Sequence, residues 1–314
     1  MKGRAVVFTG IRKVHFQDVE IPEPLDDEIV VDVEHSWISI GTEKSILFGE
    51  RLVNFPFVPG YQKSGVVRFA GKNVADLKAG DKVFVSYSRV SNIDGAGHIN
   101  PAVVKGNMAI KIPDNHPTLR YSPLVVAQVG YNAGTRPAVN KGDIAVVIGD
   151  GLVANWTAQT LVNRGADVYA LGRYDEKLQL FSDAVHKINT RINSDFETIF
   201  TGKGINAVVD TIGSTQNILR MLPLMKRDSH WVNAGFLSAE STLDLRELVE
   251  KEITLHMANG RTSERMQATF DAISQDTLQT EHLITHRFPA EQAAGAWEAI
   301  LDKKQLCLGV VLDW

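Results

Sequence analysis

The stretch VVIGDGLVAN, residues 146–155, joins an apolar run to two closely spaced glycines and then to a helix-compatible segment. Glycine weakens the interior of a strand or a helix, so glycines at such a junction indicate a close approach to the backbone. Residues 144–148 are predicted to form a buried strand, and a helix is expected from Leu152 to Gly165, a residue suited to the position after a helix end. The predicted apolar stripe of this helix consists of Ala154, Ala158, Leu161 and Val162.

Strands and helices are predicted to alternate from about Leu119 onward. Apolar runs of strand length recur at residues 144–148, 167–171, 206–210 and 230–234. Continuous apolar strands separated by helices are typical of a parallel sheet that is covered on both faces.

The first 115 residues have a different sequence pattern. Short β-like runs are separated by Gly, Pro, Asn and Asp, which indicates an irregular antiparallel or barrel-like unit. Near the other end, residues 287–305 contain a short amphipathic helix and residues 308–314 read as one last strand. That strand resembles the first half, so the chain is expected to return to its first domain.

Composition excludes several classes of protein. The chain has 314 residues, which is enough for two domains, and its net charge of −4 offers no basic field for nucleic acid. Cys307 is the only cysteine, which excludes an internal disulfide and a Cys-rich zinc site and favours a reducing compartment. No apolar run approaches the ~18 residues of a membrane span. We therefore expect a cytoplasmic protein with no nucleic-acid or membrane partner.

The glycine turn matches a dinucleotide-binding fingerprint, Gly149-x-Gly151-x-x-Ala154, placed between a strand and a helix. The first glycine permits the tight turn and the second lets the backbone approach a pyrophosphate. The N–H groups of Leu152 and Val153 at the helix start would face that anion. The alternative is a glycine turn that serves packing alone.

The end of the next predicted strand bears on the choice of cofactor. NAD enzymes usually place an acid here, about 20 residues beyond the glycines, whereas this chain has Arg173. Arg173 could form charge-assisted bonds with a 2′-phosphate and Lys177 could add a second charge, so NADP(H) is favoured. Tyr174 is a candidate for stacking on adenine. The alternative for Arg173 is an ordinary solvated charge.

Two further strand ends point to the same edge of the predicted sheet, where ligands of open α/β sheets collect. Backbone groups there could hold a nicotinamide carboxamide, although both segments could equally be ordinary turns. The residues concerned are Asp210, Thr211 and Gly213 after one strand, and Asn233, Ala234 and Gly235 after the other.

Four blocks of sequence resemble the medium-chain dehydrogenase/reductase superfamily, which includes alcohol dehydrogenases and quinone reductases. They are EIVVDVEHSWISIGTEKSILFG (28–49), FPFVPGYQKSGVVRFAGKNVADLKAGDKVF (55–84), KGDIAVVIGDG (141–151) and LITHRFPAEQAAGAWEAI (283–300). The GTE block and the Gly-Tyr pair look closest to the bacteriochlorophyllide dehydrogenase branch.

The resemblance implies an α/β protein with two domains. A GroES-like, mainly-β catalytic domain would comprise residues 1–118 and 286–314, and a Rossmann domain with a doubly wound parallel sheet would comprise residues 119–285. It further implies hydride transfer in a cleft between the two domains, and a homodimer or tetramer, of which we favour the homodimer.

The chain departs from the zinc-dependent members at each ligand position. The block Ser36–Glu43 has no cysteine, Tyr61-Gln62 replaces a His-Glu pair, and residues 124–134 contain neither Cys nor His. Serine, tyrosine and glutamine are poor zinc ligands, and the Cys-rich loop of structural zinc is absent. We therefore expect no bound metal, and we expect His35, His98 and His116 to be satisfied surface or core residues.

Without zinc, a hydroxyl or a bound water must stabilise the developing alkoxide and supply a proton. By their place in the resemblance, Tyr61, Ser39 and Thr42 are the candidates, in that order. The alternative is that Tyr61 only packs, that Thr42 caps a helix starting near Glu43, and that water does the chemistry. Glu43 is expected to orient its neighbours or to pair with a residue such as Lys63.

Three functions are compatible with this pattern. The favoured one is an NADPH-dependent, zinc-free oxidoreductase that interconverts a carbonyl and an alcohol. The second is reduction of an activated C=C bond, which requires a proton on carbon. The third is an NADPH-binding protein without turnover, because a decayed active site would also have lost its zinc ligands.

Overall fold

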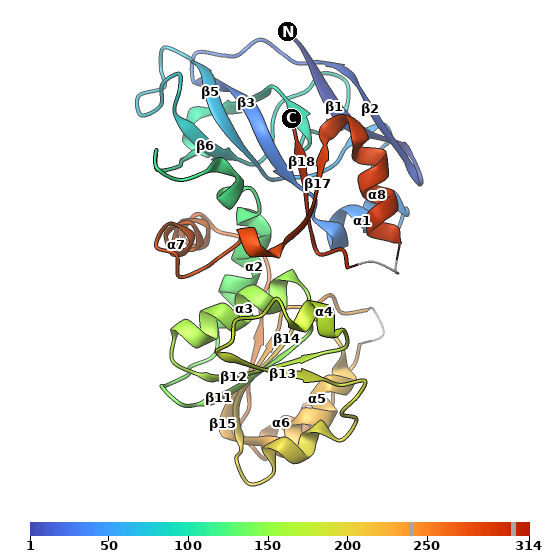
Figure 1. The fold of residues 1–314 in the computed structure, drawn as a ribbon, viewed down its shortest axis with the longest axis vertical. Coiled ribbons are helices and arrows are strands. Elements are labelled where there is room, and N and C mark those ends of the chain that lie inside the picture. The colour runs from blue at the N-terminus through green and yellow to red at the C-terminus, as the bar shows by residue number, and fades with distance from the viewer. Residues whose placement is uncertain (239–240, 303–305) are drawn as a thin grey trace. The chain divides into compact units, whose positions relative to one another are not determined.

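The computed structural model describes residues 1–238, 241–302 and 306–314 (Figure 1). It divides into two compact units, one formed by Met1–Val125 with Thr280–Trp314 and the other by Val126–Gln279. The sequence prediction placed the boundaries at 118/119 and 285/286. Residues up to Val125 stay with the first unit because the Val125 N–H donates to Gln62 Oε1 at 3.1 Å. Thr280 joins it because its hydroxyl donates to the Arg120 carbonyl at 2.7 Å.

The described residues of the first unit form two β-sheets and two α-helices. One sheet has the order β2-β1-β4-β7 with β8 on β1, and the other has the order β10-β6-β5-β3-β18-β17 with β9 on β3. The strands are β1 (Lys2–Gly10), β2 (Lys13–Glu20), β3 (Glu28–Trp37), β4 (Phe57–Val58), β5 (Lys63–Ala70), β6 (Lys82–Val85), β7 (Asp94–Gly95), β8 (Ile99–Asn100), β9 (Ala102–Lys105), β10 (Ile110–Lys111), β17 (Ile284–Pro289) and β18 (Gly309–Asp313). The helices are α1 (Ile40–Leu47) and α8 (Ala293–Leu301).

The last strand pairs antiparallel with β3, with Val311 opposite Trp37. The predicted return of the chain to its first unit is therefore confirmed. The predicted amphipathic helix is α8, which buries Ala293, Ala296 and Trp297 against the core of this unit. The end of the predicted segment, residues 303–305, lies outside the described residues.

The second unit is a six-stranded parallel sheet with the order β13-β12-β11-β14-β15-β16. Numbered by position along the chain, this is the order 3-2-1-4-5-6 of a dinucleotide-binding sheet. The strands are β11 (Ile144–Ile148), β12 (Asp167–Gly172), β13 (Val185–Asn189), β14 (Ile205–Asp210), β15 (Met225–Asn233) and β16 (Thr254–Met257). The helices are α2 (Leu124–Thr135), which begins in the first unit, and α3 (Leu152–Asn163), α4 (Asp175–Leu178), α5 (Thr215–Met221), α6 (Arg246–Val249) and α7 (Ser263–Ser274).

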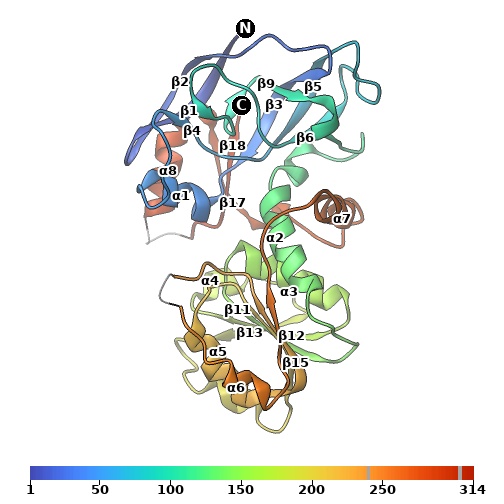
Figure 2. The same cartoon turned by 180° about the vertical axis from the view of Figure 1, so that it is seen from behind.

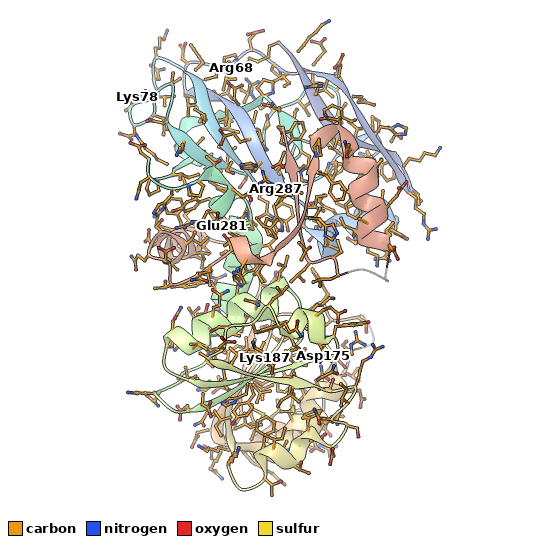
Figure 3. The ribbon with its side chains drawn as sticks, viewed as in Figure 1. Arg68, Lys78, Asp175, Lys187, Glu281 and Arg287 are labelled. Atoms are coloured by element: carbon orange, nitrogen blue, oxygen red, sulfur yellow. The ribbon has the colours of Figure 1, made fainter. Side chains whose placement is uncertain are left out.

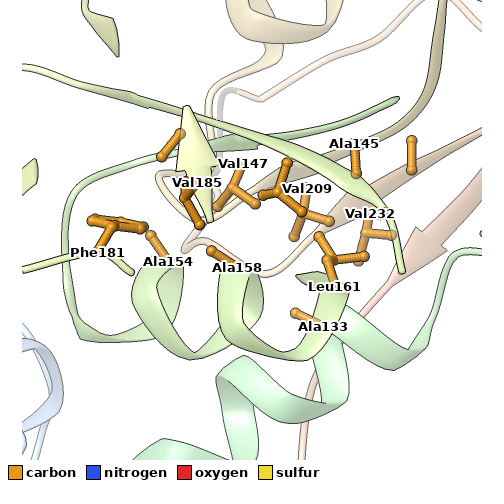
Figure 4. Close-up of a cluster of buried hydrophobic side chains, with 14 of the residues drawn as sticks. Ala133, Ala145, Val147, Ala154, Ala158, Leu161, Phe181, Val185, Val209 and Val232 are labelled. Carbon is orange, nitrogen blue, oxygen red and sulfur yellow. The ribbon is translucent and has the colours of Figure 1, made fainter. Parts of the chain in front are cut away.

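Helices cover both faces of this sheet, as the continuous apolar strands predict (Figure 2). On one face Ala154, Ala158 and Leu161 of α3 pack on Val147 and Val209, so the predicted stripe is confirmed (Figure 4). On the other face a second cluster includes residues from α5 and α6. Side chains of alternate strand positions thus enter different cores, which is why the strands are apolar throughout.

The helix after the glycine turn ends as the sequence predicts. Arg164 is the C-cap of α3, and Gly165 follows it with φ of +87°. Because that backbone conformation strains any residue with a Cβ, glycine stops the helix here and directs the chain into β12.

Candidate functional site

The turn between β11 and α3 depends on Gly149. Its φ is +129°, and a Cβ at this position would lie 2.2 Å from the Thr211 hydroxyl. Thr211 donates that hydroxyl to the Ile148 carbonyl at 2.8 Å. Thr211, predicted as a ligand-binding residue, therefore ties the β14 end to the glycine turn.

Gly151 needs another explanation. Its φ of −90° and ψ of −175° are open to any residue, and a Cβ built on it would meet no protein atom within 4 Å. Neither backbone strain nor packing requires glycine here. It is the N-cap of a 12-residue helix, and Leu152 and Val153 are the first two helical residues, both half-buried. A helix N-terminus next to open space is a suitable place for an anion that approaches the main chain closely.

Positive side chains gather at the end of β12. The guanidinium carbon of Arg173, the ammonium of Lys177 and the guanidinium carbon of Arg191 lie 5.9, 4.9 and 4.8 Å from the centre of the Tyr174 ring. Arg191 reaches this group because β13 ends beside β12, with Asn189 opposite Gly172. Three cations around one ring form a positive patch that suits a phosphate.

One carboxylate belongs to the same group. Asp150, inside the glycine turn, accepts the N–H groups of Arg173 and Tyr174 at 2.7 and 3.2 Å, and lies 3.9 Å from the Lys177 ammonium. These bonds hold the turn after β12 against the glycine turn. Together with Asp175, two negative charges stand against the three positive charges of Arg173, Lys177 and Arg191. Asp175, labelled in Figure 3, opens α4 nearby. It accepts a hydrogen bond from the Asn189 side-chain amide at 2.8 Å.

The ends of β14 and β15 form the rest of this edge. Asp210 is buried and accepts the N–H groups of Ile212, Gly213 and Ser214 at 2.8, 3.1 and 3.0 Å. A Cβ on Gly235 would lie 2.1 Å from the Gly213 nitrogen, so the two turns touch backbone to backbone.

Of the predicted residues on the second of these turns, Asn233 donates its amide to the Gly235 carbonyl at 3.0 Å. The Ala234 and Gly235 N–H groups bond to the Asp210 carbonyl at 2.8 and 3.1 Å. The side-chain amide of Asn233 is therefore hydrogen-bonded within its own turn.

In the first unit the structure brings the three predicted hydroxyl residues together. Tyr61 donates its phenolic hydrogen to Ser39 Oγ at 2.5 Å, and Thr42 also forms a side-chain hydrogen bond with the phenol. Burial raises the pKa of Tyr61, and the hydrogen bonds of Ser39 and Thr42 lower it. The charge of Glu43 raises it further. At neutral pH the phenol is therefore protonated and can act as a donor.

The alternative role considered for Thr42 is wrong. Helix α1 begins at Ile40 with Ser39 as its N-cap, so Thr42 lies inside the helix and does not cap it. Glu43 orients its neighbours, as expected, but its ionisable partner is His98 at 3.0 Å. Lys63 instead donates to the carbonyls of Ser86 and Ala96 at 2.5 and 3.1 Å.

Each histidine considered above has a partner. His35 lies 2.8 Å from Asp313, His98 lies 2.8 Å from Ser36 Oγ, and His116 lies 2.6 Å from the Tyr121 hydroxyl. Among the described residues, no three side chains of His, Cys, Asp or Glu come close enough to hold a metal ion. Within the same ranges, no helix has the length and hydropathy to cross a membrane.

Sequence reasoning missed Asp150, Arg191 and the contact of Glu43 with His98. Asp150 lies inside the fingerprint itself, so an acid there could have been noticed. Arg191 carries no local signal, because only the pairing of β13 with β12 brings it to the patch. The contact with His98 depends on how residues 94–100 fold against the segment before Tyr61.

Both units together define an α/β fold with a GroES-like, mainly-β domain and a Rossmann domain. A protein from Sinorhizobium meliloti 1021 solved bound to NADP has this fold, with a TM-score of 0.87, 17% identity and full coverage of both chains. So does an alcohol dehydrogenase from E. coli CFT073 complexed with NADH, with a TM-score of 0.86, 21% identity, and coverage of 100% of this chain and 99% of that one. The predicted fold class is confirmed.

Sequence comparison finds similarity to dehydrogenases. Residues 153–275 match the family model described as zinc-binding dehydrogenase. The 2-desacetyl-2-hydroxyethyl bacteriochlorophyllide A dehydrogenase of Cereibacter sphaeroides is 26% identical over 326 residues, which cover 100% of this chain and 99% of the relative. The chain is thus similar in sequence to dehydrogenases over almost its whole length, and its second unit matches the zinc-binding dehydrogenase model.

Proposed function

We propose that this chain is an NADP(H)-dependent oxidoreductase that interconverts a carbonyl and an alcohol without catalytic zinc. The observation that carries the proposal is Gly151, a glycine with no conformational or packing reason, at the start of α3 and beside open space. A pyrophosphate that contacts the main chain gives it a reason. The cofactor belongs to the second unit, and Tyr61 of the first unit is the proposed proton donor.

The charges at the end of β12 support NADP(H) over NAD(H). Arg173, Lys177 and Arg191 would hold a 2′-phosphate, and Tyr174 between them offers a ring on which adenine could stack. Asp150 opposes this preference but is engaged by two N–H groups and by Lys177. Structurally similar proteins have been solved with NADP and with NADH, so the proposed preference for NADP(H) rests on the local charges.

The donor set does not fit catalytic zinc. The positions that would hold the metal carry Ser39, Tyr61 and Gln62, and Gln62 already accepts the Val125 N–H. The nearby ionisable pair, Glu43 with His98, is buried and mutually bonded, and two ligands do not make a zinc site. We therefore derive no step through a metal.

Proton transfer is assigned to the hydroxyl cluster. The bound nicotinamide supplies or accepts a hydride. Tyr61, kept protonated by burial and by the charge of Glu43, donates to the oxygen that becomes the alcohol. The phenolic hydrogen leaves Ser39 Oγ for the substrate oxygen, and the hydroxyls of Ser39 and Thr42 would then donate to the phenolate left behind. In the oxidative direction Tyr61 would accept the alcohol proton.

Three assays test this assignment. The purified protein is titrated with NADPH and with NADH, zinc is measured, and NADPH oxidation is followed with a panel of ketones, aldehydes and enones. Tighter binding of NADPH, turnover with a carbonyl compound, and retained activity after dialysis against a chelator are expected. NADH binding as tight as NADPH binding would contradict the cofactor assignment, and stoichiometric zinc would contradict the metal-free mechanism. Turnover with enones alone would favour C=C reduction, and no turnover would favour a binding protein.

We also propose a cytoplasmic homodimer. The β16 edge carries the exposed apolar side chains of Leu255 and Met257, 36% and 55% accessible, and unpaired edges of this kind favour pairing with a second chain. Light scattering at several protein concentrations tests this, and a monomer at all of them would contradict it.

A further inference from the structure

A row of buried polar side chains lies behind the Tyr61 hydroxyl cluster. Trp314 donates its indole N–H to Ser36 Oγ at 2.9 Å, and Ser36 Oγ lies 2.8 Å from His98 Nδ1. His98 Nε2 lies 3.0 Å from Glu43 Oε2. The side chains of His98 and Glu43 are 0% and 1% exposed, so neither exchanges hydrogen bonds with bulk water.

The chemistry of these groups fixes the direction of each bond. An indole N–H can only donate, so Ser36 Oγ accepts from Trp314. The single hydroxyl hydrogen of Ser36 is then free to donate to His98 Nδ1. A neutral imidazole that accepts at Nδ1 carries its hydrogen on Nε2, which points at Glu43. Trp314 thereby selects, through Ser36, the tautomer in which His98 donates to Glu43.

Glu43 connects this row to the proposed proton donor. Its Oε1 accepts the Ser39 N–H at 2.7 Å, and Ser39 Oγ accepts the phenolic hydrogen of Tyr61 at 2.5 Å. Each carboxylate oxygen thus receives one N–H donor. Burial is the largest influence on the pKa of Tyr61 and raises it, whereas the hydrogen bonds of Ser39 and Thr42 lower it. The charge of Glu43 is a further influence that raises this pKa.

His98 also shapes the backbone beside the phenol. A Cβ on Gly60 would lie 2.7 Å from the His98 ring, so the ring packs directly on the residue before Tyr61. The His98 N–H donates to the Pro59 carbonyl at 2.8 Å. Side chain and backbone of His98 therefore hold the segment that presents the phenol.

We propose that Glu43 and His98 are positioning residues for Tyr61: the imidazole holds the buried Glu43 carboxyl group in place, and Glu43 fixes Ser39, which accepts the hydrogen bond of the phenol. The catalytic role of this arrangement rests on the proposed function. The coupling of Glu43 to Tyr61 does not, because it can be measured without substrate or cofactor. Tyr87, Thr42 and Ser39 are the other groups that influence the phenol. Lys63 is buried and lies two residues after Tyr61 in the sequence. It donates to two backbone carbonyls and has no carboxylate partner among the described contacts.

The first test measures the phenol directly. Glu43→Gln keeps an oxygen for the Ser39 N–H but removes the charge, so Tyr61 should ionise at a lower pH than in the unmodified protein. Ultraviolet difference titration reports phenolate formation, and subtraction of the matching Tyr61→Phe protein isolates Tyr61 from the other tyrosines. Glu28→Gln is the matched control, because Glu28 is 2% exposed in the same unit but is bonded to Leu25 N and Arg89.

An unchanged ionisation of Tyr61 in Glu43→Gln would overturn the proposal, even if the protein is a reductase. Suppose instead that Glu43→Gln shifts the ionisation of Tyr61 but Tyr61→Phe does not change turnover. The coupling of Glu43 to Tyr61 would then stand, and the proposed function would be contradicted. For an active reductase, Glu43→Gln should move the high-pH limb of kcat to lower pH with KM unchanged, and a purely structural role would not move that limb.

The second test concerns His98. Nitrogen-15 NMR of the ring, assigned with His98→Gln, should show the neutral tautomer with hydrogen on Nε2. An imidazolium, or hydrogen on Nδ1, would overturn the proposed direction of the row. His98→Leu removes a donor from a buried carboxylate and should lower the melting temperature strongly. His98→Gln keeps a donor and should retain most of the stability and an unshifted ionisation of Tyr61.

Discussion

The hydroxyl of Tyr61 donates to Ser39 Oγ over 2.5 Å, across 22 residues of sequence, with Thr42 as its second hydroxyl partner. We predict that Tyr61→Phe lowers kcat for carbonyl reduction by roughly a hundredfold to a thousandfold, because it removes the proton donor and leaves the ring in place. The dissociation constant for NADPH should not change. Stopped-flow single-turnover kinetics and a fluorescence titration measure the two quantities.

Tyr87→Phe is the matched control for this variant. Tyr87 lies close enough to influence Tyr61, yet 52% of it is exposed. It should retain the unmodified rate. Equal losses in both variants, or no loss in Tyr61→Phe, would contradict the assignment of Tyr61.

Gly151 supplies a second prediction. Because its backbone angles suit alanine and a Cβ would meet no protein atom, Gly151→Ala should fold, with only the small loss of melting temperature expected for alanine at an N-cap. Its methyl group would stand where the pyrophosphate approaches, so NADPH affinity should fall at least about tenfold. Calorimetric titration gives the affinity.

Gly295→Ala is its control, since a Cβ on Gly295 in α8 would also meet no protein atom within 4 Å. That variant should gain up to about 1 kcal/mol of stability from the higher helix propensity of alanine, with unchanged NADPH binding. Equal NADPH affinity in Gly151→Ala and the unmodified protein would contradict a close approach of the pyrophosphate to Gly151.

The sequence predicts the strands that lie inside the sheets better than those at the edges. Runs such as 144–148 and 206–210 are apolar throughout because both faces are covered, and they form β11 and β14. By contrast β13, VHKIN, and β16, TLHM, were not predicted. Both are edge strands with exposed positions, so they lack the apolar run that marks a buried strand.

The same distinction applies to the candidate site. The glycine turn is local in sequence and could be recognised from its spacing, and the group of Tyr61, Ser39 and Thr42 could be recognised from the resemblance. The Glu43–His98 pair spans 55 residues and depends on how a loop folds back. Spacing alone gives no sign of such a contact, which is why His98 was predicted to be only a satisfied histidine.

Cofactor preference gives a third prediction. Arg173→Gln should weaken NADPH binding roughly tenfold to a hundredfold, the loss expected for a charge-assisted hydrogen bond, and should leave NADH binding unchanged. Arg191→Gln should act in the same direction. Lys187→Gln is the control, because Lys187 lies on β13 of the same sheet but pairs with Asp183 at 3.4 Å (Figure 3). A parallel loss for NADPH and NADH in Arg173→Gln would contradict contact with the 2′-phosphate.

Lys63 leads to a prediction about stability and pH. Burial lowers the pKa of Lys63 to about 7, and its two carbonyl partners need only the two hydrogens of a neutral amine. In the unfolded chain this amine has an ordinary pKa near 10.5. Between about pH 7 and pH 10.5 the unfolded state therefore binds more protons than the folded state, so the contribution of Lys63 to stability rises with pH.

Lys63→Met, which fills similar space without a titrating group, should remove this contribution. The free energy of unfolding of the unmodified protein should rise relative to that of the variant by up to about 1.4 kcal/mol per pH unit within that window. Urea unfolding at several pH values measures the difference, with Lys187→Gln again as an exposed control. Parallel pH profiles for the unmodified protein and Lys63→Met would mean that Lys63 stays charged inside the folded protein, held by the carbonyls of Ser86 and Ala96.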